Sequence, residues 1–145
     1  MNKASVKLKK IQELCLSKNI TISTAESCTG GYLSKLLTDR SGSSKFYVGS
    51  VTAYSNSVKN ELLNVPNDIL EKYGAVSKEV SLLMAEGIFN SIKSEIAIST
   101  TGVMELDSST GSKKPQVFIT IKSEKTHVSS HFYLHEDRDT NRKKT

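Results

Sequence analysis

The sequence predicts an α/β domain in which helices cover both faces of a β-sheet. Three observations carry this prediction. Strand-like and helix-like segments alternate along most of the chain, two strand-like segments follow each other near its end, and 37% of the 145 residues are apolar. Alternation favours parallel strands, and the consecutive pair adds an antiparallel element. The length suits one domain with its own core.

Each element rests on a local pattern. Apolar residues recur every three or four positions over residues 4–18, with lysines between them, which predicts an amphipathic helix. Residues 20–24 alternate apolar and hydroxyl side chains, as in a strand, and leucines after Gly30 and Gly31 show helical spacing. The remaining predictions are a strand over 46–54, short helices over 56–63 and 67–73, a helix capped by Ser77 with apolar residues up to Ile92, a strand over 96–101, a polar loop over 103–115, and hairpin strands over 117–121 and 126–134.

Charge and hydropathy exclude several function classes. The formal charge is +5, from 20 basic and 15 acidic residues, but most of the excess lies in the first 20 residues. The chain has no long basic run with interleaved aromatic residues, which is the pattern typical of nucleic-acid binding. The longest apolar run, residues 82–85, is far shorter than the roughly 18 residues of a membrane-spanning helix. The lysine-rich start is not followed by the apolar stretch and cleavage site of a signal peptide. We expect a cytoplasmic protein with no membrane or nucleic-acid partner.

Cysteines and histidines give no pattern typical of a metal site. Cys15 and Cys28 have no partner at metal-ligand spacing, and we expect both to be small buried thiols. His127, His131 and His135 are spaced by four, but apolar residues alternate with them as in a strand. Residues four apart on a strand are separated by roughly 13 Å, too far for one metal. We therefore expect no metal site.

The segment from Thr24 to Gly31 is a first candidate site. A strand that ends in hydroxyl residues runs into two glycines that open a helix. The N–H groups of a first helical turn can bind a phosphate or a developing oxyanion, and Ser27 would present its hydroxyl beside them, although a G-x-S-x-G motif is absent. The alternative is an ordinary helix start, with Thr29 as N-cap and glycines for close packing. The local pattern leaves both open.

A second polar corner follows the strand predicted over 46–54. Ser55 or Asn56 can cap the next helix, which places Lys59 near its first turn. The positive end of the helix dipole disfavours a charged lysine and lowers its pKa. A partly neutral lysine can deprotonate a serine, so a serine–lysine pair is chemically possible. The alternative is an exposed lysine on a short helix.

Four motifs follow one another along the chain. They read TAESCTGG at 24–31, SGSS at 41–44, VTAYSN at 51–56 with a lysine at 59, and YGAVS at 73–77. In this order and spacing they resemble the CinA C-terminal-domain family, which includes nicotinamide-mononucleotide amidohydrolases. The resemblance covers residues 5–142 and implies a three-layer α/β/α sandwich with a mixed, mostly parallel sheet, commonly dimeric. It also implies hydrolysis of the carboxamide of nicotinamide mononucleotide to nicotinate mononucleotide and ammonia.

The resemblance also implies a role for each matching residue. Ser27 would be the nucleophile, Lys59 its base and Tyr54 a supporting catalytic group. Backbone N–H groups near residues 28–30 would stabilise the oxyanion, and no metal or cofactor is implied. Substrate contacts would come from Cys28, Thr29, Gly30, Gly31, Ser44, Asn56, Thr101, Gly102 and, as an anion contact, Arg138.

Two departures from the family pattern support an alternative, a catalytically impaired nucleotide-binding or interaction module on the same fold. Where the family reads T-G-I-A-G-P, this chain has Met104, Glu105 and Leu106 in place of the last three small residues, and Glu105 would repel a substrate phosphate. The chain ends at residue 145, where the family continues into a closing helix. We therefore expect a single domain over 1–145 without that helix, and a homodimer that covers the bare sheet face.

Overall fold

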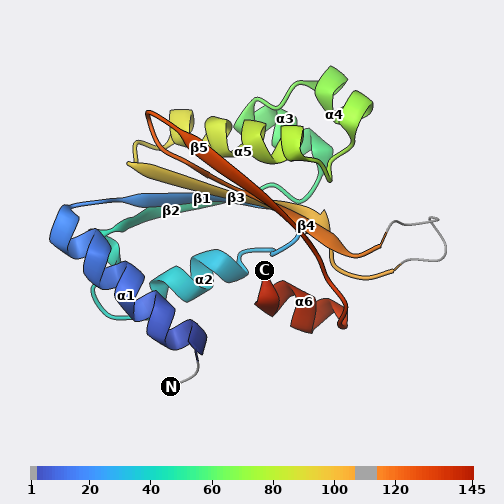
Figure 1. Cartoon of the computed structure of the whole chain (residues 1–145). Helices are drawn as coiled ribbons and strands as arrows, with labels where there is room; N and C mark the ends of the chain where they lie inside the picture. The colour runs from blue at the N-terminus through green and yellow to red at the C-terminus, as the bar shows by residue number, and fades with distance from the viewer. Residues whose placement is uncertain (1–2, 107–113) are drawn as a thin grey trace.

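A mixed five-stranded sheet forms the middle layer of the computed structural model, which describes residues 3–106 and 114–145 (Figure 1). The strand order is β2-β1-β3-β4-β5. Strand β1 pairs in parallel with β2 and β3, while β4 is antiparallel to both β3 and β5, so β5 runs in the same direction as β1. The strands are β1 (Ile22–Glu26), β2 (Tyr47–Thr52), β3 (Ile96–Val103), β4 (Gln116–Lys122) and β5 (His127–Tyr133).

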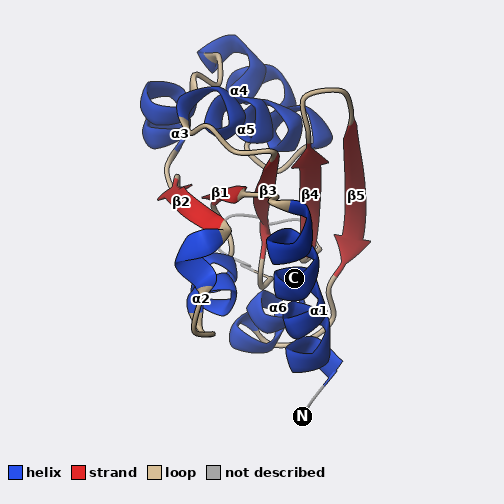
Figure 2. Cartoon of the chain, turned by 90° about the vertical axis from the view of Figure 1, so that its left-hand side faces the viewer, coloured by secondary structure: helices blue, strands red, loops and turns tan. Residues whose placement is uncertain are grey.

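Helices cover both faces of this sheet, so the predicted α/β/α sandwich is confirmed (Figures 1 and 2). One face carries α3 (Asn56–Leu63), α4 (Asn67–Tyr73) and α5 (Lys78–Ser91). The opposite face carries α1 (Lys3–Lys18), α2 (Tyr32–Thr38) and α6 (Arg138–Lys144). A short 3₁₀ helix, η1 (Ser43–Lys45), leads into β2.

The two faces of the sheet bury separate apolar clusters. On one face α5 places Val80, Met84 and Ile88, all fully buried, against the alanines of β1 and β3. On the other, a cluster around Cys15 and Ile22 joins α1 and α2 to the sheet. Strand β1 is an inner strand and is buried at all five positions, because both of its faces are covered. Its hydroxyl side chains are accommodated by hydrogen bonds, not by exposure to water.

The predicted helices and strands are confirmed with small shifts at their ends. The strand predicted over 20–24 forms over Ile22–Glu26, and that predicted over 96–101 continues to Val103. Helix α6 was not predicted, because it has no apolar periodicity. Its start could have been read from Asp137, whose carboxylate accepts the N–H groups of residues 139 and 140.

Part of the predicted polar loop over 103–115 lies outside the described residues, namely 107–113. None of the described helices is long and apolar enough to cross a membrane. The expected lack of a further closing helix stays a prediction.

Candidate active site

A cavity of about 520 Å³ opens at the carboxyl ends of β1, β2 and β3. Its lining comes from the segments that follow β1 and β2, from residues 75 and 76 between α4 and α5, from the end of β3 with residues 104–106, and from the start of α6. The chain leaves β1 toward β2 on one side and returns to β3 on the other, with helices on opposite faces. In α/β sheets ligands commonly bind beyond the strand ends at such a reversal.

Ser27 and Lys59 meet at the inner end of this cavity. Lys59 Nζ lies 3.0 Å from Ser27 Oγ and donates to the carbonyl oxygen of Ala53 at 3.0 Å and of Tyr54 at 3.5 Å. The Lys59 side chain is only 1% exposed, so the alternative of an exposed surface lysine is wrong. In the part of the chain that the structure describes, no carboxylate lies within ion-pair distance of Lys59 Nζ.

Burial lowers the pKa of Lys59, and the electrostatic effect of the Cys28 sulfur opposes this to a smaller extent. The direction agrees with the expectation from the sequence, and its largest cause is loss of hydration on burial, which the sequence did not indicate. The two carbonyl acceptors hold two N–H bonds of a neutral amine. Its lone pair can then face the Ser27 hydroxyl.

A buried carboxylate, not the Thr29 hydroxyl, caps helix α2. Glu26 is fully buried and accepts the N–H groups of Gly31, Leu33 and Ser34, together with the hydroxyls of Thr29 and Ser34. The alternative of a helix start with Thr29 as N-cap is therefore wrong: the N-cap position is Gly31. The first turn of α2 is also satisfied inside the molecule, so it does not offer these donors to a phosphate.

Two N–H groups directly after Ser27 in the chain have no acceptor among the described residues, and of the two residues only Cys28 lines the cavity. The N–H of Gly30 donates to Ser27 O at 3.0 Å, and that of Ser27 donates to Thr100 O at 2.9 Å. Within the described residues, the N–H groups of Cys28 and Thr29 donate to no other residue. Gly30 allows this tight turn because its φ is +59°. The donors available to an oxyanion are thus fewer than the sequence suggested.

The Cys28 thiol also lines the cavity but differs chemically from Ser27. It is 5% exposed and packs with Met104, Val117 and Leu134. Burial raises the pKa of Cys28 to about 12. The thiol is therefore neutral near pH 7 and lacks the thiolate that a cysteine nucleophile needs.

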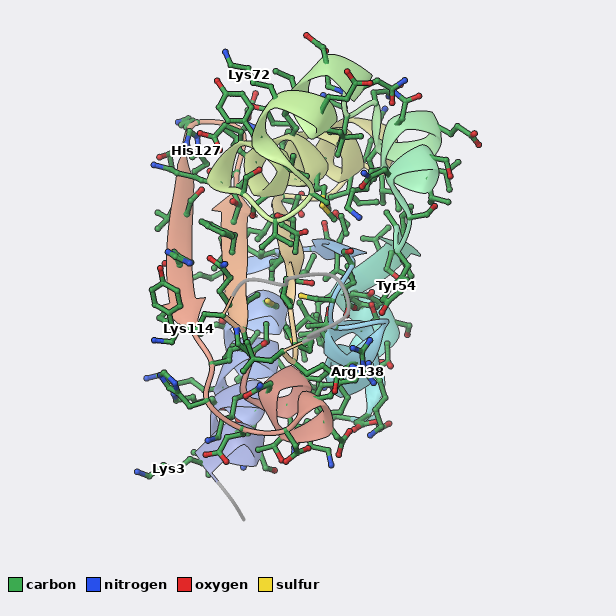
Figure 3. All side chains as sticks on the ribbon, turned by 90° about the vertical axis from the view of Figure 1, so that its right-hand side faces the viewer. Lys3, Tyr54, Lys72, Lys114, His127 and Arg138 are labelled. Atoms are coloured by element: carbon green, nitrogen blue, oxygen red, sulfur yellow. The ribbon has the colours of Figure 1, made fainter. Side chains whose placement is uncertain are left out.

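The mouth of the cavity carries a hydrogen-bonded group that the sequence pattern did not reveal. Arg138 Nη1 forms an ion pair with Glu105 at 2.9 Å, and Nη2 donates to Tyr54 Oη at 2.7 Å. Figure 3 shows Tyr54 and Arg138 on the same side of the molecule; Tyr54 lies in the segment between β2 and α3, and Arg138 begins α6. Glu105 and Arg138 are 33 positions apart, so no local motif could have paired them.

The CinA C-terminal domain model matches residues 5–145. The chain belongs to this family. CinA-like proteins of Cytophaga hutchinsonii and Leptospira interrogans are 45% and 40% identical to it, over 71% and 85% of this chain. These alignments span only 25% and 30% of the relatives' own length.

Solved structures of the CinA family share this fold. The competence damage-inducible protein A of Klebsiella pneumoniae superposes with a TM-score of 0.93 at 24% identity, over 99% of this chain and 89% of that one. A competence/damage inducible protein of Agrobacterium tumefaciens gives a TM-score of 0.90 at 26% identity, over 98% and 88%. These likenesses establish the mixed sheet with helices on both sides.

The other residues that the CinA resemblance singled out divide into two groups. Asn56, Thr101 and Gly102 line the cavity, with Thr101 Oγ1 donating to Ala75 O at 2.6 Å. Outside the cavity lie Thr29, Gly30, Gly31 and Ser44. Ser44 belongs to η1, which precedes β2, and therefore lies at the opposite end of the sheet from the cavity.

Proposed function

We propose that this CinA-family chain is an amidohydrolase that cleaves the carboxamide of a nicotinamide nucleotide, or of its dephosphorylated nucleoside, by a serine–lysine mechanism. One observation carries the proposal: Lys59 Nζ is buried 3.0 Å from Ser27 Oγ, with no carboxylate near it among the described residues. A lysine in such surroundings is chemically suited to act as a general base. The names of the relatives state no reaction, so the activity rests on this site and on the motif resemblance.

Acylation would begin with Lys59 as a neutral amine. Its two N–H bonds point to the carbonyls of Ala53 and Tyr54, and its lone pair accepts the Ser27 proton. As Oγ bonds to the carboxamide carbon, the carbonyl oxygen becomes an oxyanion beside the N–H group of Cys28. The C–N bond then breaks, and the nitrogen takes the proton from Lys59 and leaves as ammonia.

Deacylation would use the same groups in the same roles. Lys59 accepts a proton from water, and the hydroxide bonds to the acyl carbon. Collapse of the second oxyanion breaks the bond to Ser27 Oγ, which recovers its proton from Lys59. The product is the nicotinate nucleotide, and the chain returns to its starting state.

A second candidate is a nucleotide-binding or interaction module without turnover. It is favoured by the mouth of the cavity, where the guanidinium expected to contact an anion is already paired with Glu105 at 2.9 Å. Such a module would bind a nucleotide and release no ammonia.

Ammonia release separates the two candidates. The purified chain is incubated with nicotinamide mononucleotide or its dephosphorylated counterpart, nicotinamide riboside, beside Ser27→Ala and a matched control, Ser17→Ala. Ser17 lies on α1, where its hydroxyl donates to Leu14 O. We expect release by the wild type and the control, and a loss of about 10³-fold or more in Ser27→Ala. A wild type that binds either compound but releases no ammonia favours the module.

A further inference from the structure

The cavity changes character between its inner end and its mouth. Ser27 and Lys59 at the inner end are 7% and 1% exposed, whereas Tyr54 at the mouth is 59% exposed. A carboxamide that reaches Ser27 Oγ leaves the rest of its molecule extending outward. A phosphate at the far end of such a substrate stays near the mouth, because burying a charged and strongly hydrated group is costly.

The mouth carries one guanidinium, which is already hydrogen-bonded to two partners. Among the described residues that line the cavity, Arg138 and Lys59 are the only cations, and Lys59 is held at the inner end. Both terminal nitrogens of Arg138 are engaged, one by the Glu105 carboxylate and one by the Tyr54 hydroxyl. The formal charge of the Arg138–Glu105 pair is zero. A phosphate arriving at this guanidinium therefore also meets a carboxylate.

We propose that Glu105 is a specificity-determining residue that makes the cavity favour nicotinamide nucleosides over the corresponding phosphorylated nucleotides. The identity of the amide end rests on the proposed function, whereas the discrimination is a property of binding alone. A cavity of about 520 Å³ lies within the usual range for small-molecule sites and accommodates a nucleoside.

The exposure of the Arg138–Glu105 ion pair determines how Glu105 distinguishes a nucleotide from a nucleoside. The side chains of Arg138 and Glu105 are 43% and 52% exposed, so their ion pair is weak and can open without disturbing the fold. Selection therefore comes from the Glu105 carboxylate, which offsets the attraction of the guanidinium and leaves the desolvation of a phosphate uncompensated, not from a closed gate. Salt screens the attraction that Glu105→Gln restores, so the gain in mononucleotide binding in that variant decreases as ionic strength rises.

Binding in a background without turnover tests the proposal. Every variant carries Ser27→Ala, and calorimetry measures the Kd of nicotinamide riboside and of nicotinamide mononucleotide, which differ only in the phosphate. With Glu105 present, we expect the riboside to bind about tenfold more tightly. Glu105→Gln should strengthen mononucleotide binding by about tenfold and change riboside binding by less than about threefold.

The control is Glu124→Gln, which makes the same charge change at an exposed position between β4 and β5, at the end of the sheet away from the cavity. It should leave both dissociation constants unchanged. Equal binding of the two compounds with Glu105 present, equal effects of Glu105→Gln on both, or binding of neither compound would each overturn the proposal. Selective binding without ammonia release by the chain that retains Ser27 would overturn only the proposed function.

Discussion

Lys59 Nζ lies 3.0 Å from Ser27 Oγ, although the two residues are 32 positions apart. Parallel pairing of β1 with β2 explains this proximity. Glu26 is opposite Thr52 in that pairing, so the chain segments that follow both strands start at the same edge of the sheet. Ser27 follows β1 directly, and Lys59 lies on α3, which begins shortly after the end of β2. The pair is therefore a consequence of the topology.

The pH dependence of the rate follows from the burial of Lys59. Burial lowers the pKa of Lys59, so the neutral base is populated at pH values below its ordinary pKa of about 10.4. We expect kcat for ammonia release to rise with pH through the lowered pKa and then to level off. The unfolded chain binds more protons between the lowered and the ordinary pKa. The free energy of unfolding therefore also increases with pH in that window.

The matched variant for this pH profile is Lys59→Met, which matches the lysine side chain as far as Cε and removes the amine. In that variant the residual rate should lose the rising limb assigned to Lys59. A limb that persists at the same pH would assign the base to another group. Glu26 is not available for that role, because its carboxylate accepts five hydrogen bonds from α2 and the preceding turn.

Glu26 is expected to be essential for stability. Glu26→Ala removes the buried acceptor of three N–H groups at the start of α2. We expect the free energy of unfolding, measured with urea, to fall by about 3 kcal/mol or more. Glu13→Ala, on the exposed side of α1, is the control and should change it by less than about 0.5 kcal/mol. A loss of similar size in both variants would refute the role of Glu26 as the cap.

Cys28 is expected to be dispensable for chemistry. Its raised pKa of about 12 keeps the thiol neutral, so Cys28→Ala should retain kcat within about fivefold. The same variant should lower the free energy of unfolding by about 1 kcal/mol, because it removes a buried sulfur from contact with Met104 and Val117. Loss of activity in Cys28→Ala with full activity in Ser27→Ala would exchange the roles of the two residues.

Gly102 is expected to be required for strand pairing. A Cβ at this position would lie 2.3 Å from the carbonyl oxygen of Gln116 and 2.9 Å from Val117 Cα, both backbone atoms of β4. We expect Gly102→Ala to lower the free energy of unfolding by about 2 kcal/mol. The control is Gly49→Ala in β2, where the nearest atom to a Cβ is a side-chain carbon of Ile92 at 3.7 Å. Equal melting temperatures for the two variants would contradict this explanation.

Local patterns in the sequence predicted most of the fold. The spacing of Val80, Met84 and Ile88 identifies α5, and these residues are fully buried. Ser77 was predicted to cap that helix, and its hydroxyl accepts the Val80 N–H. Such features depend on a few neighbouring residues, so one sequence suffices to find them. Helix α6 was missed because it contains no apolar side chain, and its only buried residue is Asn141.

The site was less accessible to sequence reasoning, because it depends on contacts between distant segments. The glycines at 30 and 31 suggested an open helix terminus, but the Glu26 carboxylate already occupies it. The motif that contains Ser44 matches the family, yet a motif does not tell at which end of a strand it lies. The pairing of Glu105 with Arg138 likewise required the placement of α6 beside the end of β3.

A double-mutant cycle on Ser27 and Lys59 tests the central claim most directly. The rate of ammonia release is measured for the wild type, Ser27→Ala, Lys59→Met and the double variant, each shown by its melting transition to be folded. Because the two side chains act as one unit, each single change should lower kcat by about 10³-fold, and the double variant should be at most a few-fold slower than either. Losses that multiply in the double variant, a single variant that keeps most of the rate, or a wild type without ammonia release would contradict the account.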